Sequence, residues 1–302
     1  YNKKKQIAGN PKDMTNSDTS EVLDDIKTKR PPPMCVKNIK DITFDVNFED
    51  YIIQTKYDGV RAIMYEEDNN VIIYSRTSKT YEGFQEIRDE MSVLFQTVKQ
   101  FISSEIYFDG EIYKHGVPQN DISGVVRRSK NAKVISDLEY HIYDCFFPNS
   151  KDEKMPSKER QSILQKLKDL HVVDNLSHIC LVDNYSALNR EDANMMMKDL
   201  LKLKYEGIIL RHKEKNYEYS HKGYHSSNVL KMKPRYDSEF KCIGYADGSL
   251  LKGKDKDSLL WICEVDEKDA KIKNDRTFRV VPNMSYEERK ILYAKLNKEI
   301  FD

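Results

Sequence analysis

The chain of 302 residues is long enough for about two domains, and its hydrophobic residues (39%) are sufficient for sizeable cores. It carries 50 Lys or Arg and 50 Asp or Glu, so the formal net charge is zero; this excludes a histone-like protein, and a polyanionic partner would have to bind local basic patches. No apolar run approaches the roughly 20 residues of a membrane-spanning helix, so we expect no membrane partner.

The N-terminal part of the chain changes from a polar segment to strands. Residues 1–30 lack apolar periodicity and predict a flexible leader or the end of an upstream domain. The run Arg30-Pro31-Pro32-Pro33 favours an extended backbone where folded structure begins. The β-rich stretches that follow predict an antiparallel meander, with strands at 51–53, 60–65 and 71–74.

Helical and strand signals alternate between residue 82 and Pro234. Apolar residues at helical spacing predict a helix over 82–101, and two more helices are predicted from Ser157 and over 192–203. Further strands are predicted at 105–113, 140–147, 208–210 and 229–232. Pro234 ends this set of elements, so the domain boundary is predicted near Arg235.

A second, shorter set of elements follows the boundary. It contains three β-rich stretches, at 240–245, 259–265 and 278–281. A last helix opens with Ser285 and Glu288, the spacing of a capping box. The order of elements therefore predicts an α+β protein with a large unit over 31–235 and a small unit over 236–302.

The most informative local pattern is Lys56-Tyr57-Asp58-Gly59-Val60-Arg61, which lies between two predicted strands. Asp-Gly between strands is a strong hairpin signal, so a plain turn is the simpler interpretation. The alternative is a lysine nucleophile at a strand end, beside a glycine that lets a phosphate approach the backbone. Lysine attacks phosphorus only as the neutral amine, and its ordinary pKa is about 10.4. The alternative therefore requires other charged groups or a metal nearby.

Charged residues do recur at unusual places in later strands. Asp109-Gly110-Glu111 interrupts a predicted strand, although acidic residues and glycine are poor strand formers. Glu206-Gly207 stands at the entrance to another strand. Lys231 and Lys233 fall on one face of a third strand, where two ammonium groups repel unless they share an anion. Each pattern alone is compatible with a solvated surface. Their combination indicates a phosphate-handling site.

In this order the motifs resemble the signature of the covalent nucleotidyltransferases, the family of polynucleotide ligases and messenger RNA capping enzymes. That signature consists of K-x-D-G, a D-G-E-type strand, an aromatic-Asp motif, E-G and K-x-K, and the matches span residues 54–234. Arg61 completes the K-x-D-G-x-R form that is usual in ligases. Residues 237–281, including the Gly253-Lys254 loop, are similar to the start of the oligonucleotide-binding (OB) barrel in ATP-dependent DNA ligases of large DNA viruses.

The resemblance implies a fold for each unit. Residues 31–235 would form an adenylation (nucleotidyltransferase) domain of antiparallel sheets with flanking helices. Residues 236–302 would form an OB-fold β-barrel domain. The last basic motif of the family is not visible before Asp302, so we expect this barrel to be incomplete at its C-terminus.

The resemblance also implies roles for residues around the nucleotide. Lys56 matches the nucleophile that forms lysyl-AMP, and Gln54 occupies the place that contacts the adenine. Tyr143 matches the aromatic residue that stacks on the purine, although its spacing fits ordinary core packing equally well. Lys231 and Lys233 match the pair that steadies the phosphates and activates the nucleophile.

A second group of matches concerns charge around the ribose and the metal. Arg61 and Arg76 match arginines near the ribose and the nick phosphate. Glu111 matches a carboxylate linked to the ribose or the metal, and Glu206 matches a metal-linked carboxylate. Arg127 and Arg128 match no motif, and a solvated loop is their simpler interpretation.

The predicted function is an ATP-dependent DNA ligase that seals nicked duplex DNA, with Mg²⁺ as the metal and Mn²⁺ as a substitute. Residues 202–235 hold nine Lys or Arg against three Glu, a local basic surface for phosphate contacts. Three alternatives stay open: an RNA ligase, a capping guanylyltransferase that uses GTP, and a non-catalytic nucleic-acid-binding module. The barrel at 237–302 speaks against an RNA ligase, Arg61 and the barrel sequence speak against a capping enzyme, and the intact lysines and Glu206 speak against the third.

The cysteines bear on the compartment. The five cysteines are scattered and form no C-x-x-C pair, which predicts reduced thiols and no structural zinc. We therefore expect an intracellular monomer in the nucleus or cytoplasm, at a cytoplasmic replication site if the protein is viral.

Overall fold

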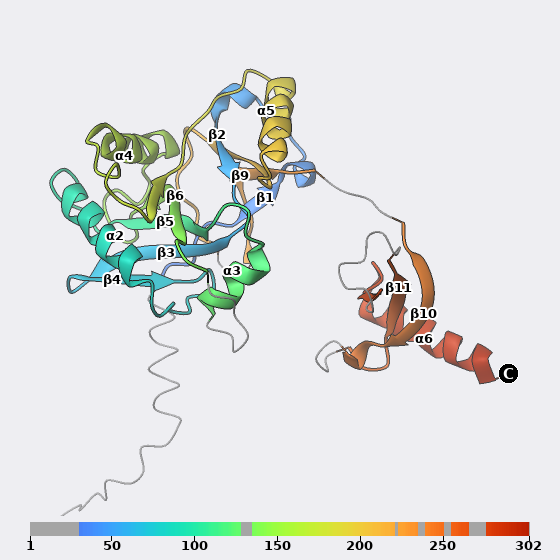
Figure 1. The fold of residues 1–302 in the computed structure, drawn as a ribbon. Helices are drawn as coiled ribbons and strands as arrows, with labels where there is room; N and C mark the ends of the chain where they lie inside the picture. The colour runs from blue at the N-terminus through green and yellow to red at the C-terminus, as the bar shows by residue number, and fades with distance from the viewer. Residues whose placement is uncertain are drawn as a thin grey trace, which may run out of the picture. The chain divides into compact units, whose positions relative to one another are not determined.

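The computed structural model describes residues 30–127, 135–220, 223–234, 239–250, 255–265 and 276–301 (Figure 1). The chain divides into two compact units, one up to Pro234 and one from residue 235 onward. Most of the predicted leader, Arg128 and the Gly253-Lys254 loop lie outside the described residues.

The first unit contains two β-sheets. The five-stranded sheet has the order β4-β3-β5-β6-β7, formed by β3 (Val60–Glu67), β4 (Asn70–Tyr74), β5 (Tyr107–Tyr113), β6 (Glu139–Phe146) and β7 (Ile179–Leu181). The four-stranded sheet has the order β1-β9-β8-β2, formed by β1 (Val36–Asn38), β2 (Tyr51–Lys56), β8 (Gly207–His212) and β9 (Ser226–Met232). Most neighbours are antiparallel. The β1–β9 and β6–β7 pairs are parallel, which the antiparallel expectation did not include.

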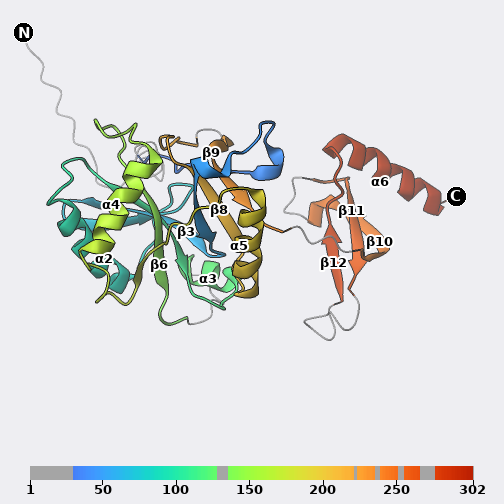
Figure 2. The same cartoon turned by 90° about the horizontal axis from the view of Figure 1, so that it is seen from above.

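Helices cover these sheets. Helix α2 (Gln85–Val98) and helix α4 (Ser157–Asp169) lie beside each other and bury their apolar faces in the core of the five-stranded sheet (Figures 1 and 2). Helix α5 (Arg190–Lys202) packs on the other sheet, and the side chain of Asn189 caps its first turn. These helices confirm the periodicity predictions. Helix α3 (Gln119–Val126) was not predicted, because Ile122 and Val126 are its only large buried side chains.

Gly110, in the middle of β5, is required by a close approach of two strands. A Cβ atom at this position would lie 2.5 Å from the carbonyl oxygen of His141 and 2.6 Å from the ring of Tyr140. The Tyr140 ring is held in place, because its single hydroxyl proton is shared between two carbonyl oxygens, of Ala62 at 3.0 Å and Phe108 at 2.9 Å. The glycine of the D-G-E strand thus allows β5 and β6 to pair around a fixed tyrosine.

Replacing Gly110 by alanine should therefore destabilise the first unit. We expect the free energy of unfolding to fall by about 1–3 kcal/mol, the range of overpacked cores. Urea unfolding followed by circular dichroism measures the loss. Gly244, a strand glycine of the second unit with open space around it, is the matched control. Equal stability of the Gly110→Ala and wild-type proteins would contradict this account.

The second unit contains a three-stranded antiparallel sheet and a helix within its described residues (Figure 2). Its strands are β10 (Lys241–Asp247), β11 (Leu259–Glu264) and β12 (Thr277–Val280), in that order. Helix α6 (Tyr286–Phe301) contacts β11. The predicted capping box is confirmed, since the Ser285 backbone N–H donates to Glu288 and the Glu288 N–H donates to the Ser285 hydroxyl. None of the described helices is both long and apolar enough to cross a membrane.

Candidate active site

A cavity of about 440 Å³ lies in the first unit where its two sheets meet. Strands β2, β8 and β9 contribute one wall and strands β3 and β6 the other. Six of the predicted site residues line it, namely Gln54, Lys56, Arg61, Arg76, Tyr143 and Lys231. The K-x-D-G, aromatic-Asp and K-x-K motifs are therefore brought to one concave site, whereas Glu111, Glu206 and Lys233 are not among the residues that line it.

Lys56 is the last residue of β2. Glu206 directly precedes β8, the strand that pairs with β2. The carboxylate of Glu206 forms ion pairs with the ammonium groups of both Lys56 and Lys233, the second at 2.7 Å. Burial alone would raise the pKa of Glu206, but the hydrogen bonds and charges of the two lysines outweigh it and lower that pKa. Glu206 is therefore an anion shared by Lys56 and Lys233, whereas the lysine spacing led us to expect one shared by Lys231 and Lys233.

Glu111 lies on β5, opposite Arg61 of β3. Burial raises the pKa of its carboxyl to about 8, although the charges of Lys56 and Arg61 act in the other direction and that of Glu206 adds to the rise. Gly59 fits against the same strand, because a Cβ there would lie 2.4 Å from the carbonyl oxygen of Ile112. The K-x-D-G turn and the D-G-E strand are thus packed directly together.

The guanidinium of Arg61 is held in place from several directions. Its Nε donates to Asp109 at 2.8 Å, and its Nη1 donates to the Met34 carbonyl oxygen at 2.7 Å. Asp109 also accepts from the Tyr217 hydroxyl at 2.7 Å. Arg61 therefore presents a fixed positive charge to the cavity.

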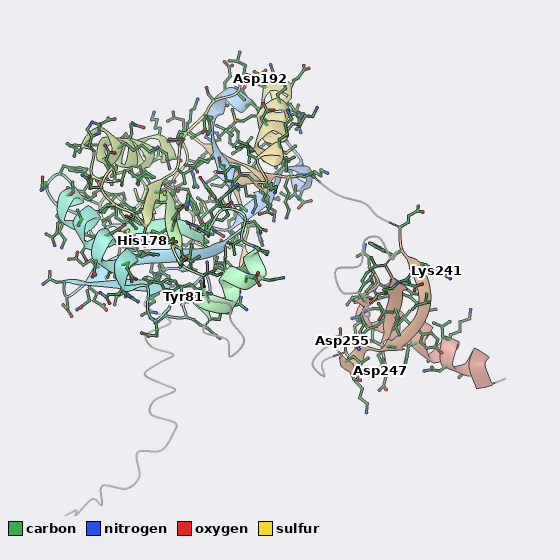
Figure 3. The ribbon with its side chains drawn as sticks, in the orientation of Figure 1. Tyr81, His178, Asp192, Lys241, Asp247 and Asp255 are labelled. Carbon is green, nitrogen blue, oxygen red and sulfur yellow. The ribbon has the colours of Figure 1, made fainter. Side chains whose placement is uncertain are left out.

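The turn after β4 carries the other predicted arginine. Arg76 is exposed and lines the cavity, as does Tyr81 further along the same segment (labelled in Figure 3). Arg127, at the end of α3, is also exposed and lines the cavity, so it is more than part of a solvated loop. The exposed guanidinium groups of Arg76 and Arg127 therefore both line the cavity.

Two guanidinium groups lie near the ring of Tyr143. The Arg61 and Arg211 carbons are 6.0 Å and 5.8 Å from its ring centroid, within the range of cation–π contacts. Gln54 holds the backbone beside this ring, because its amide nitrogen donates to the Tyr143 carbonyl oxygen at 2.9 Å. The same nitrogen donates to Asn184 at 2.9 Å, and the Gln54 amide oxygen accepts from Arg211. Gln54 thus positions the aromatic side chain, and its contact with an adenine stays a prediction.

A buried ion-pair network next to Tyr143 was not predicted from the sequence. Asp144, fully buried, accepts from Arg160 at 2.9 Å and from Arg211 at 2.5 Å. Burial would raise the pKa of Asp144, but the charges of the two arginines lower it below the usual range. The aspartate of the aromatic-Asp motif is therefore a structural anchor that fixes Arg211 against the ring. Arg211 follows the aliphatic residues of β8, and a charged residue directly after such a run is the sequence signal that could have indicated the network.

Asp144→Asn should cost about 3–5 kcal/mol at pH 7, because it leaves two buried guanidinium groups without their carboxylate. Since the folded-state pKa of Asp144 is lowered, its contribution to stability is present above its ordinary pKa and is lost as the pH falls through the folded value. Denaturant unfolding at neutral pH and below pH 4 measures both effects. A wild-type advantage that stays constant across this range would contradict the assignment.

Comparison with known proteins identifies the family. Residues 33–233, two thirds of the chain, match the family described as "ATP dependent DNA ligase domain". The chain belongs to this ligase family. The resemblance inferred from the five ordered motifs is thereby confirmed.

Related ligases cover most of this ligase-family chain. The DNA ligase of African swine fever virus (isolate Warthog/Namibia) is 35% identical over 275 residues, which are 89% of this chain and 61% of that protein. The DNA ligase of Methanococcus aeolicus is 28% identical over 195 residues, 61% of this chain and 32% of that protein. The chain thus spans about three fifths of the length of its viral relatives.

Solved ligase structures share the fold. A structure from a structure–function analysis of Lig E DNA ligases has a TM-score of 0.62 at 17% identity and covers 87% of this chain and 88% of its own. The ATP-dependent DNA ligase of bacteriophage T7 in complex with ATP has a TM-score of 0.52 at 16% identity, covering 89% and 86%. The chain therefore has a mixed, sheet-rich α+β fold of the kind found in ATP-dependent ligases.

Proposed function

We propose that this chain is the catalytic part of an ATP-dependent DNA ligase that seals nicks in duplex DNA through a lysyl-AMP intermediate. The observation that carries the proposal is the position of Lys56. Its amine stands at a strand end on the wall of the cavity, paired with a carboxylate that also holds Lys233. A neighbouring cation activates a lysine nucleophile, and phosphoryl transfer depends on positioning and on positive charge at the phosphates, both of which Lys233 can support.

Different residues of the cavity would bind different parts of ATP. Tyr143 offers its ring to the purine, backed by Arg211. Arg61, fixed by Asp109, offers a preorganised positive charge near the ribose and α-phosphate. Lys231, on the cavity wall, and Lys233 neutralise phosphate charge as it develops.

The reaction then takes place in three transfers at phosphorus. The Lys56 nitrogen forms a bond to the α-phosphorus of ATP while the bond to pyrophosphate breaks, and the amine releases its proton. A 5′-phosphate oxygen at the nick next displaces the lysine and takes the AMP group. The adjacent 3′-hydroxyl finally attacks the 5′-phosphate, seals the strand and expels AMP.

Glu111 and Glu206 fit a divalent ion of the Mg²⁺ type. Both offer the hard oxygen donors that Mg²⁺ or Mn²⁺ prefers; burial raises the pKa of Glu111 and the charge of Glu206 adds to the rise, so a bound cation would relieve repulsion between the two carboxylates. A bound Mg²⁺ would supply positive charge at the phosphates and compete with Lys56 for the oxygens of Glu206. The chain's own part is to keep these carboxylates next to the nucleophile.

The proposed division of the chain follows its two units. Residues 31–235 would form the adenylation domain. Residues 236–302 would form an OB-fold domain, which the antiparallel order β10-β11-β12 and the adjoining helix support. The basic stretch 202–235 would supply phosphate contacts to duplex DNA without reading its sequence.

Nick sealing by the purified chain tests the proposal. A duplex DNA with one labelled 5′-phosphate at a nick is incubated with Mg²⁺ and either ATP or GTP, at low and moderate salt. We expect sealing with ATP only, and steep weakening of DNA binding as salt rises. Activity with GTP alone would favour a capping enzyme, and sealing of RNA but not DNA would favour an RNA ligase.

A further inference from the structure

A second cluster of reactive side chains lies on the five-stranded sheet, separate from the lysines of the cavity. Glu139 and His141 of β6 and Cys180 of β7 place their ligand atoms within 4.8 Å of one another. The Nε2 atom of His141 is 2.8 Å from a carboxylate oxygen of Glu139, and the Cys180 sulfur is 3.9 Å from the same oxygen. Among the described residues, no other group of three His, Cys, Asp or Glu side chains meets so closely.

The pairing of the strands creates this cluster. Glu139 and His141 are two residues apart on β6, so their side chains point to the same face of the sheet. Cys180 stands opposite His141 in the parallel β6–β7 register. The three side chains are therefore aligned by the backbone rather than by a flexible loop.

We propose that Glu139, His141 and Cys180 bind a transition-metal ion of the Zn²⁺ class. A thiolate, an imidazole and a carboxylate are the ligands that Zn²⁺ takes in proteins, and three protein ligands leave its fourth position open. Bond lengths of about 2.0–2.3 Å place ligand atoms of a tetrahedral ion roughly 3.3–3.6 Å apart. The observed separations of 2.8 and 3.9 Å lie on either side of this range.

The surroundings favour binding. The ring of His141 is packed against the rings of Tyr57 and Tyr113, with centroids 4.5 and 5.3 Å away, so its orientation is fixed. The side chain of Glu139 is 28% exposed, which gives an ion access from solvent. The ammonium of Lys114 lies 3.7 Å from the other oxygen of Glu139. The oxygen proposed as a ligand faces His141 and Cys180.

This site is chemically distinct from the nucleotide site. Mg²⁺ prefers an all-oxygen set, whereas sulfur and nitrogen ligands select softer ions. Glu111 stands opposite His141 across the β5–β6 pair, so it is the residue through which the two sites adjoin. The Glu111→Gln variant can therefore distinguish an ion at the thiol cluster from one at the nucleotide site.

The test measures metal binding by the full chain, stripped with a chelator and kept reduced. Zn²⁺ is titrated in competition with a chromophoric chelator, and Co²⁺ is titrated in parallel to observe a thiolate-to-cobalt charge-transfer band. We expect one tight equivalent and that band in the wild type. Cys180→Ser should abolish the band, and both Cys180→Ser and His141→Gln should weaken Zn²⁺ binding by about 100-fold or more. Circular dichroism shows whether each variant is folded.

Two controls make the result decisive. Cys242→Ser removes an exposed thiol of the second unit, and Glu111→Gln removes the adjoining carboxylate; both should bind Zn²⁺ like the wild type. Absence of the charge-transfer band in the wild type would overturn the proposal. So would a loss of binding in Cys242→Ser or Glu111→Gln with none in Cys180→Ser.

Discussion

Replacing Lys56 by alanine should abolish transfer of AMP from ATP to the protein, with a fall in rate of about 10⁴-fold or more. The reason is direct, since the substitution removes the nitrogen that forms the bond to phosphorus. The fold should survive, because the Lys56 side chain is 20% exposed and its ion-pair partner Glu206 keeps Lys233. The measurement is the label that remains on the protein after incubation with α-labelled ATP and Mg²⁺.

Two further variants distinguish the loss of the reactive amine of Lys56 from the loss of its positive charge and from the loss of an unrelated ion pair. Lys56→Arg keeps a cation beside Glu206 but lacks a reactive amine, and it should be as inactive as Lys56→Ala. Lys158→Ala removes a lysine that is also paired with a carboxylate, that of Glu214, away from the cavity, and it should leave the rate unchanged. Label on Lys56→Arg at the wild-type rate would show that the nucleophile lies elsewhere.

Replacing Glu206 by glutamine should slow formation of the lysyl-AMP adduct by about 10²-fold or more, the scale of losing one preorganised electrostatic group. Glu206 joins Lys56 and Lys233, so the neutral amide leaves two ammonium groups near each other without a shared anion. It also removes one of the two carboxylates proposed for Mg²⁺. Single-turnover adenylation at saturating ATP measures the effect.

Glu66→Gln is the matched control for this substitution. Glu66 is also a largely buried carboxylate paired with a lysine, Lys99, but it lies at the far end of β3 and does not line the cavity. It should adenylate like the wild type. An unchanged single-turnover rate in Glu206→Gln would refute the role assigned to this carboxylate.

The residues of the proposed reactive site could be selected from the sequence because they stand in short motifs with local meaning. The acidic strand at Glu111 and the paired lysines violate local preferences, and together with the turn after Lys56 they led to the family. The structure places Lys56 and Lys231 on the same cavity and joins Lys233 to Glu206. Local patterns were sufficient because phosphate chemistry dictates the residue types.

The supporting part of the site could not be predicted in this way. Asp144 and Arg211 are 67 positions apart, and the Gln54 amide meets Tyr143 across 89 positions. Such contacts depend on how the two sheets pack, and the spacing of residues along the chain does not predict this packing. The parallel pairs of β1 and β7 were missed for the same reason. The expectation of no structural zinc considered cysteine spacing along the chain, whereas the cluster proposed here joins Cys180 to His141 across two strands.

The covalent intermediate gives the most direct test of the central claim, that Lys56 transfers AMP from ATP to nicked DNA. The protein is labelled with α-labelled ATP and Mg²⁺, freed of nucleotide, and its modified residue is located by mass spectrometry. Nicked duplex DNA is then added without further ATP. We predict label on Lys56 alone, its transfer to the 5′-phosphate, and release as AMP with one sealed nick per labelled protein. Label from GTP instead of ATP, or a labelled protein that never transfers AMP to DNA, would contradict the account.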